Sequence, residues 1–290
     1  MFRRTTTKTA FAAIAALTTL TALSGCGGSD SPAPTGAPNA AEEAELGHVH
    51  GLGVDPGDGT LYVASHFGVF RIADDGARER VADRWQDTMG FAIVGPGHFL
   101  GSGHPDLRER LPSSLGLIES TAGAKTWDTV SLLGDADLHA IEPVGDRIYA
   151  YDSTTGSLLL TTDRKNWTTI STQPLYDLAA NPADPTIVYA TTDRGALISS
   201  KNGQAPRPVP GAPTLTAIDW QPDGPLVGIA ADGTVMTSPN AAQWQEAGQL
   251  DGPAEALDAI AGRWHAATES GVYESTDNGQ TWETVASHDH

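Results

Sequence analysis

The sequence predicts an all-β protein, a β-propeller of about six four-stranded blades. Short apolar runs alternate with turns rich in Gly, Pro, Asp and Asn, which is the pattern of many short strands. A turn-like segment also recurs, beginning at positions 72, 120, 161, 199, 237 and 275, so that the steps are 48, 41, 38, 38 and 38 residues. A period of about 40 residues is typical of propeller blades, and a seventh blade would need about 40 residues more than the chain offers.

The first 44 residues are expected to lie outside the propeller. Residues 1–25 read as a lipoprotein signal peptide, with a basic start (Met1–Lys8) and an apolar stretch (Ala10–Leu23) that is too short to span a membrane comfortably. Residues 26–44 are rich in Gly, Ser, Pro and Ala and predict a flexible tether. The propeller itself is expected over residues 45–290.

The segment Leu23–Cys26 resembles a bacterial lipobox. This resemblance implies cleavage before Cys26, lipidation of its thiol, and a protein held at the cell membrane outside the cytoplasm. Cys26 is the only cysteine of the chain, so the mature protein cannot form an internal disulfide. Its stability must therefore come from the core.

Each period reads as four strands separated by turns. Blade 1 is expected at 48–54, 60–65, 68–72 and 78–81; blade 4 at 176–180, 186–192, 195–200 and 206–209; and blade 6 at 257–261, 264–270, 271–276 and 282–286. Two ways of closing the ring remain open at this point. The strand at 282–286 completes its own blade, or a segment around 42–47 pairs there instead.

One turn carries a recognisable motif. Residues 275–282 fit the pattern S-x-D-x-G-x-T-W at every defined position, and the upstream copies are weaker. The motif resembles that of the BNR/Asp-box propellers, which include sialidases, sortilin-type receptors, photosystem II assembly factors and bacterial lipoproteins labelled glycosyl hydrolases. In such a turn the Asp accepts backbone hydrogen bonds, the Gly takes a positive φ and the Trp packs into the seam between blades. The residues expected in these structural roles are Ser275, Asp277, Gly279 and Trp282.

The net charge of the chain limits the classes of partner that it can bind. The formal net charge is −19, and removal of Arg3, Arg4 and Lys8 with the signal peptide leaves −22. Such an acidic surface repels nucleic acid and anionic membrane surfaces. We therefore expect no nucleic-acid partner, and membrane attachment through the lipid on Cys26 only.

Four to five of the nine histidines are predicted to lie on one face, together with Met89. In a propeller the first strand of each blade lines the channel, so the starts of first strands share one mouth with the loops between second and third strands. Imidazoles suit Cu, Zn, Ni and Fe, and a thioether adds a preference for copper. This favours a transition-metal site, with copper as the expected cofactor, although solvated channel histidines are the alternative. The predicted ligands are His48, His50, His66, His104, Met89 and His139.

The leading hypothesis is a non-enzymatic surface lipoprotein that binds copper at the channel mouth. A glycoside hydrolase of the sialidase-like type is the alternative, although the family's three substrate-binding arginines have no obvious counterparts here, and a metal-assisted hydrolase would use the same histidines. A third hypothesis is a monomeric protein-binding scaffold, with the blade 2 loop at 104–116 as its contact. The candidate catalytic carboxylates for a hydrolase are Asp87, Asp137, Asp177 and Asp258.

Overall fold

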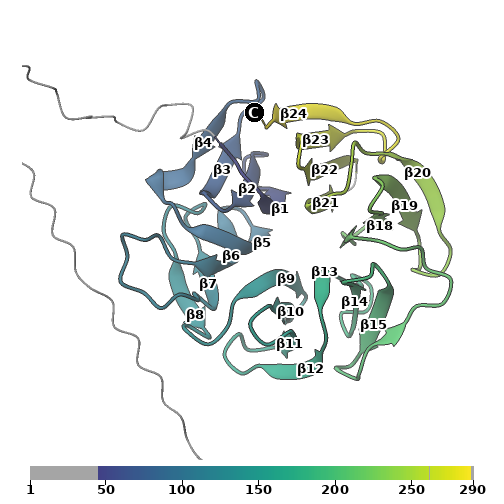
Figure 1. Ribbon diagram of the computed structural model, residues 1–290, viewed down its shortest axis with the longest axis horizontal. Helices are drawn as coiled ribbons and strands as arrows, with labels where there is room; N and C mark the ends of the chain where they lie inside the picture. The colour runs from purple at the N-terminus through teal and green to yellow at the C-terminus, as the bar shows by residue number, and fades with distance from the viewer. Residues whose placement is uncertain (1–44, 261, 289–290) are drawn as a thin grey trace, which may run out of the picture. The chain divides into compact units, whose positions relative to one another are not determined.

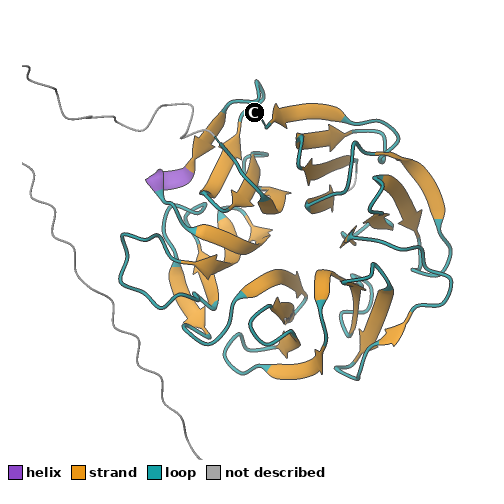
Figure 2. Cartoon of the chain, in the orientation of Figure 1, coloured by secondary structure: helices purple, strands orange, loops and turns teal. Residues whose placement is uncertain are grey.

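The computed structural model describes residues 45–260 and 262–288 and shows six four-stranded antiparallel sheets in a ring around a central channel (Figure 1). The predicted fold class is confirmed. The signal peptide (1–25) and the tether (26–44), including Cys26, lie outside the described residues. Within the described part of the chain, helix is confined to one 3-10 turn, η2 (Val81–Asp83), drawn in purple in Figure 2. No helix there has the length and apolar character needed to cross a bilayer.

Every blade is one continuous stretch of chain, and its strands follow one another in order across the sheet. Blades 1 to 3 contain β1 (Val49–Val54), β2 (Leu61–Ser65), β3 (Gly68–Ile72) and β4 (Arg78–Arg80); β5 (Asp87–Gly95), β6 (His98–His104), β7 (Leu117–Ser120) and β8 (Asp128–Ser131); and β9 (Leu138–Val144), β10 (Arg147–Asp152), β11 (Ser157–Thr161) and β12 (Thr168–Thr172). Blades 4 to 6 contain β13 (Leu175–Ala180), β14 (Ile187–Thr192), β15 (Leu197–Lys201) and β16 (Arg207–Pro208); β17 (Ala217–Asp219), β18 (Leu226–Ile229), β19 (Thr234–Ser238) and β20 (Gln245–Gln249); and β21 (Ala256–Ile260), β22 (Arg263–Thr268), β23 (Gly271–Ser275) and β24 (Glu283–Ser287).

Burial explains the two kinds of strand in the sequence. All residues of β2 are buried, and β3 exposes only Arg71, because both faces of these middle strands pack against neighbouring blades. At the rim, β12 buries none of its residues. Continuous apolar runs therefore mark the middle of a blade, whereas Thr- and Ser-rich segments mark its outer edge.

The ring closes by packing between whole blades. Each pair of neighbouring blades shares one apolar cluster in the described chain, and the pair formed by the first and last blades is no exception. In that cluster Val49 and Phe70 of blade 1 meet Ala267 and Val272 of blade 6. β24 completes its own blade, and no strand between residues 45 and 48 pairs with it. Of the two closures left open by the sequence, the structure has the first.

Acidic side chains join neighbouring blades around the channel. In each case a carboxylate of one blade accepts a backbone N–H from the inner strand of the next. The pairs are Glu142 with Ala180 at 2.9 Å, Asp177 with Ile218 at 2.8 Å, Asp219 with Ala259 at 2.6 Å, and Glu255 with Val49 at 3.0 Å.

The turn between β23 and β24 has the hydrogen bonds expected of the motif at 275–282. Asp277 accepts the backbone N–H of Thr281 at 2.9 Å and the hydroxyl of Ser275 at 2.9 Å. Gly279 has a φ of +82° and donates its N–H to Ser275 Oγ at 2.8 Å. Trp282 packs on the cluster shared by blades 5 and 6. This turn is a structural element, far along the chain from the histidines of blades 1 to 3.

Candidate metal centre

The candidate site lies at one mouth of the channel, where β1 and β5 begin and β2 ends. His48 and His50 stand at the start of β1, His66 follows β2, and Asp87 opens β5 in the next blade. Antiparallel order places the beginning of an inner strand beside the end of the second strand. The repeat therefore brings these side chains together although up to 39 residues separate them along the chain.

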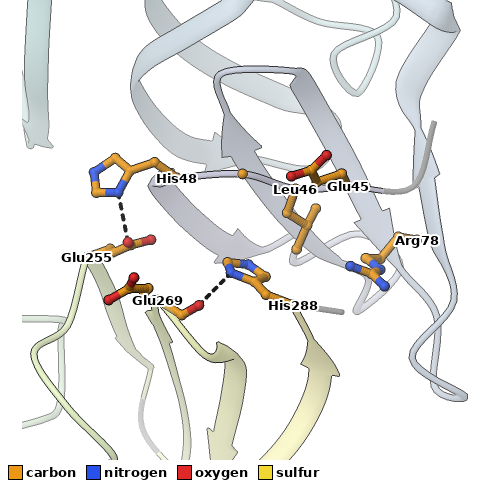
Figure 3. A pocket seen from close by; sticks show the side chains of 8 residues that line it. Glu45, Leu46, His48, Arg78, Glu255, Glu269 and His288 are labelled. Atoms are coloured by element: carbon orange, nitrogen blue, oxygen red, sulfur yellow. Dashed lines mark hydrogen bonds and ion pairs between the residues drawn. The ribbon is translucent and has the colours of Figure 1, made fainter. Parts of the chain in front are cut away.

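His48 faces blade 6 (Figure 3). Its Nδ1–H donates to Glu255 Oε1 at 2.7 Å, and the second oxygen of the same carboxylate accepts the Val49 N–H. The hydrogen bond that His48 donates to Glu255 raises the pKa of His48. The two side chains form part of the lining of a pocket of about 350 Å³ at the junction of blades 1 and 6. His48 is thus held by a carboxylate that the sequence reasoning missed.

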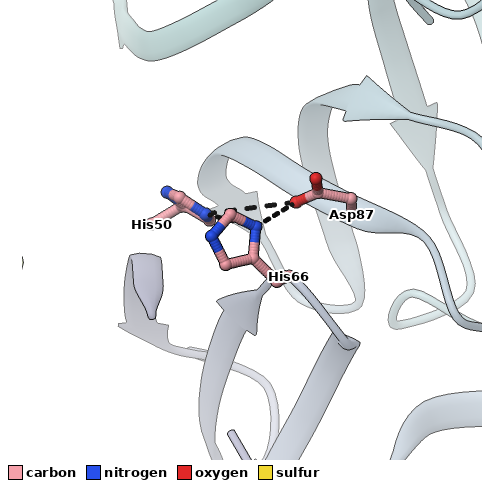
Figure 4. Close-up of side chains that lie close together, drawn as sticks. All are labelled: His50, His66 and Asp87. Carbon is pink, nitrogen blue, oxygen red and sulfur yellow. Dashed lines mark hydrogen bonds and ion pairs between the residues drawn. The ribbon is translucent and has the colours of Figure 1, made fainter. Parts of the chain in front are cut away.

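His50, His66 and Asp87 converge on one point (Figure 4). His66 Nδ1 lies 2.9 Å from Asp87 Oδ1 and 3.2 Å from His50 Nε2, and His50 Nε2 lies 4.0 Å from Asp87 Oδ1. All three potential ligand atoms lie within 4.8 Å of one another. Metal–ligand bonds of about 2.0–2.2 Å around one ion require separations of this order. The two nitrogens and one oxygen therefore form a set that can hold a metal ion.

The protonation of His50 suits a metal ligand. Its side chain is only 10% exposed. Burial, followed by the charges of His66, His48 and His139, lowers the pKa of His50 to about 3. At neutral pH the ring is therefore uncharged, with a nitrogen lone pair at Nε2 or Nδ1, and metals bind the neutral imidazole.

His66 carries a proton on the nitrogen that faces Asp87. Its Nδ1–H donates to Asp87, while the same nitrogen lies beside His50 Nε2. A metal ion entering here takes the place of that proton, because imidazole ligands bind through a nitrogen lone pair.

The other predicted ligands form a second group one blade further on. His139 Nε2–H donates to Asp137 Oδ2 at 2.8 Å, and His104 Nε2 lies 3.7 Å from the same oxygen. The structure therefore divides the six predicted ligands, with His104 and His139 around Asp137. Met89 lines the channel with His50 and His139, two residues after Asp87 on β5.

The four candidate catalytic carboxylates do not form one group. Asp87 and Asp137 belong to the two histidine groups described above. Asp177 and Asp258 also line the channel, where Asp177 accepts the Ile218 N–H at 2.8 Å and Asp258 accepts from Gln221 Nε2 at 3.5 Å, each from the neighbouring blade. Burial raises the pKa of Asp177 to about 7 and raises that of Asp258 well above its ordinary value. Asp258 Oδ2 has no hydrogen-bond partner in the described chain.

Sequence reasoning missed three residues that line the channel or contact its histidines. Glu255 directly precedes β21, just as His48 directly precedes β1, so the repeat frame held the signal that could have found it. Asp219 is the last residue of β17 and accepts from Gln221 Nε2 at 3.2 Å. Ser113 binds His104 through its backbone carbonyl, and no side-chain pattern reports such a contact.

The blade 2 loop is tied down at its start. Asp106 accepts the Trp85 N–H at 3.0 Å and pairs with Arg108 at 2.6 Å, and Arg84 pairs with Glu109 at 2.8 Å. Leu107 nevertheless is 99% exposed. A large apolar side chain is thus presented to solvent by an anchored loop.

Comparisons with known proteins support the fold and nothing finer. No protein-family model matches the chain, and the search of curated proteins gave no match. Among solved structures it is similar to a chain of a nidogen/laminin complex (TM-score 0.59, 11% identity, 75% of this chain and 89% of that one) and to virginiamycin B lyase from Staphylococcus aureus (0.56, 12%, 83% and 85%). It is also similar to YCF48 from Cyanidioschyzon merolae (0.50, 14%, 82% and 85%). At these identities the likeness shows that the chain is a β-propeller and carries no function with it.

Proposed function

We propose that this protein binds a transition-metal ion at the channel mouth through His50 Nε2, His66 Nδ1 and Asp87 Oδ1. The observation that carries the proposal is the convergence of these three atoms within 4.8 Å of one another. Two imidazoles and one carboxylate are a common donor set for first-row metals, and they leave coordination positions open for water or a further ligand.

Copper is the metal we propose. Among divalent first-row ions Cu²⁺ binds a given nitrogen and oxygen site most tightly. Met89 lines the same channel, and its thioether would favour Cu(I) after reduction. The proposed role is binding, with the carboxylates Asp177 and Asp258 joining blades through the hydrogen bonds described above.

We further propose that the propeller is tethered outside the cytoplasm by a lipid on Cys26. The support is the lipobox-like segment Leu23–Cys26 and the composition of the stretch that follows it. The exposed Leu107 makes the blade 2 loop the proposed contact for a protein partner.

The test is a copper titration of the full chain, purified in detergent without a histidine tag and stripped of metal by a chelator. Wild type is expected to bind Cu²⁺ tightly, and His50→Ala/His66→Ala is expected to weaken binding at this site by more than about 100-fold, because two of three ligands are lost. Calorimetry and metal analysis after desalting measure both.

His98→Ala is the matched control. His98 stands at the other end of β6 from His104 and donates to Glu119 at 2.6 Å, so its loss should leave copper binding unchanged. A folded wild-type protein that binds no metal, or a double variant that binds as wild type does, would show that His50 and His66 are ordinary channel histidines.

A further inference from the structure

Two buried carboxylates, Asp219 of blade 5 and Asp258 of blade 6, share one nitrogen donor at the channel wall. Gln221 Nε2 lies 3.2 Å from each oxygen of Asp219 and 3.5 Å from Asp258 Oδ1. Gln221 follows β17 in the loop between the first and second strands of its blade, so it stands at the end of the channel opposite His66, which follows a second strand. One nitrogen can therefore reach carboxylates of two neighbouring blades there.

One oxygen of this pair has no partner. Asp258 is 6% exposed, and its Oδ2 has no hydrogen-bond partner in the described chain. This oxygen lies 3.8 Å from the position that a Cβ on Gly53 would occupy, and both residues line the channel. A buried carboxylate oxygen without a donor is costly unless a cation or a proton satisfies it.

The electrostatic surroundings of the two carboxylates favour a cation. Burial, followed by the charge of Asp219, raises the pKa of Asp258 and that of Glu142 well above their ordinary values. Burial also raises the pKa of Asp219, and it raises that of Asp177 to about 7. All four side chains line the same channel. Because desolvation and like charges oppose their ionised forms, a positive group among them would be stabilised by each.

The distances suit a nitrogen cation. Separations of 3.2 to 3.5 Å from one atom are at the long end for N–H···O hydrogen bonds and far beyond metal–oxygen bonds of about 2.0–2.2 Å. The Gln221 amide has two N–H hydrogens and no charge, whereas an alkylammonium has three and a positive charge. Such a group matches these acceptors better than the amide does, and the channel of about 1130 Å³ has room for the rest of its molecule.

We propose that the channel binds an organic primary amine whose ammonium group lies between Asp219 and Asp258, at the position of Gln221 Nε2. The site goes beyond the proposed function and does not depend on it, since neither carboxylate is a proposed metal ligand. The ammonium donates to both carboxylates, Asp258 Oδ2 included, and the partly exposed Gln221 side chain moves aside. The remainder of the ligand extends along the channel.

The experiment is a calorimetric titration of the full chain, untagged and stripped of metal as above, at pH 8. The probe is 1,4-diaminobutane, and 1,4-butanediol is the uncharged compound of equal length. Wild type should bind one equivalent of the diamine and none of the diol. Asp219→Asn/Asp258→Asn keeps the size of both side chains, and it should weaken diamine binding by more than about 10-fold because two charge-assisted hydrogen bonds are lost.

Two control variants separate this site from other causes of binding. The chain has a net charge of −19, so amines also gather at its surface. Asp135→Asn/Asp251→Asn removes two exposed carboxylates and should bind the diamine as wild type does. His50→Ala/His66→Ala should do so too, which keeps this test apart from that of the metal site.

Three results would overturn the proposal. Equal weakening by the buried and the exposed Asn pairs would mean surface attraction alone. Diamine binding lost with His50→Ala/His66→Ala would place the ligand at the other mouth. No binding by folded wild-type protein would mean that the two carboxyls hold protons and need no cation.

A second measurement does not depend on any variant folding. Thermal unfolding of wild type is followed with 1,4-diaminobutane and with potassium chloride at matched ionic strength. A ligand of the folded state raises the midpoint temperature, so the diamine should give the higher value. Equal midpoints would refute the site.

Discussion

At the scale of single residues, the pKa values of two histidines only two positions apart, His48 and His50, are shifted in opposite directions. His48 is 51% exposed and donates to Glu255, which raises its pKa above the ordinary 6.5. His50 is 10% exposed with other histidines around it, and its pKa falls to about 3. Desolvation and like charges disfavour the imidazolium, whereas a carboxylate partner favours it. The same residue type is therefore an ion-pair partner at one position and a neutral imidazole, the form that a metal binds, at the other.

A first prediction concerns this ion pair. We expect Glu255→Gln to lower the free energy of unfolding by about 1 kcal/mol or less, because the pair is partly exposed. The pKa of His48 is raised from 6.5, so its share is fully present below pH 6.5 and disappears as pH rises through the folded value. The pKa of Glu255 is lowered from 4.5, so its share is fully present above pH 4.5 and disappears as pH falls through the folded value.

The loss should consequently be greatest between pH 4.5 and 6.5. Urea unfolding of wild type and Glu255→Gln across pH 4 to 9 measures it, with His48→Gln and the double variant completing a cycle. A difference between wild type and variant that does not change with pH would contradict the ion pair.

At the scale of elements, one close approach fixes the turn between β23 and β24 against the neighbouring strand. Gly279 has a φ of +82°, and a Cβ placed on it would lie 2.6 Å from Trp264 Cζ3. Trp264 is 1% exposed and belongs to the cluster between blades 5 and 6. The turn motif therefore needs glycine here for two reasons, backbone conformation and space.

The matched pair Gly279→Ala and Gly59→Ala separates these reasons. Gly59 has a nearly equal φ of +77° with nothing within 4 Å of its Cβ position. We expect Gly59→Ala to cost about 1 kcal/mol from backbone strain alone, and Gly279→Ala to cost about 1–3 kcal/mol more from overpacking. Chemical denaturation gives both values. Equal losses would mean that Trp264 moves aside freely.

At the scale of the whole molecule, the proposed metal joins two blades. His50 and His66 come from blade 1 and Asp87 from blade 2, so an ion at this site links sheets otherwise held by apolar packing and hydrogen bonds. Because the chain has one cysteine, an internal disulfide cannot cross-link the blades, whereas a bound metal ion can. Binding to the folded state alone also raises its stability by mass action.

We therefore expect copper to stabilise the wild-type protein, by about 2.7 kcal/mol when free ion is 100 times its Kd. Thermal unfolding with and without Cu²⁺ measures the shift, and an excess of chelator should reverse it. The variant His50→Ala/His66→Ala should show a much smaller shift. If copper lowered the midpoint temperature of unfolding of both wild type and the variant, the ion would be binding to the unfolded chain instead.

Much of the fold could be predicted from the sequence because its signals are local. The period of about 40 residues, the apolar runs of middle strands such as Leu61–Ser65 and the motif at 275–282 each report on neighbouring residues. The closure of the ring could not be predicted, because it depends on whether Val49 and Phe70 pack against Val272, more than 200 residues away.

The sequence by itself determined the six blades, and it determined that His48, His50, His66 and His104 stand at strand ends on one mouth. Only the tertiary structure decided which of them meet: His50 and His66 at Asp87, His104 and His139 at Asp137, and His48 at Glu255. The position of a residue along its strand fixes the end at which the side chain lies, and alternation along the strand fixes the face. Distances of 3 to 4 Å between ligand atoms on different blades depend instead on how far each blade is rotated about the channel and on the packing that sets each side-chain rotamer.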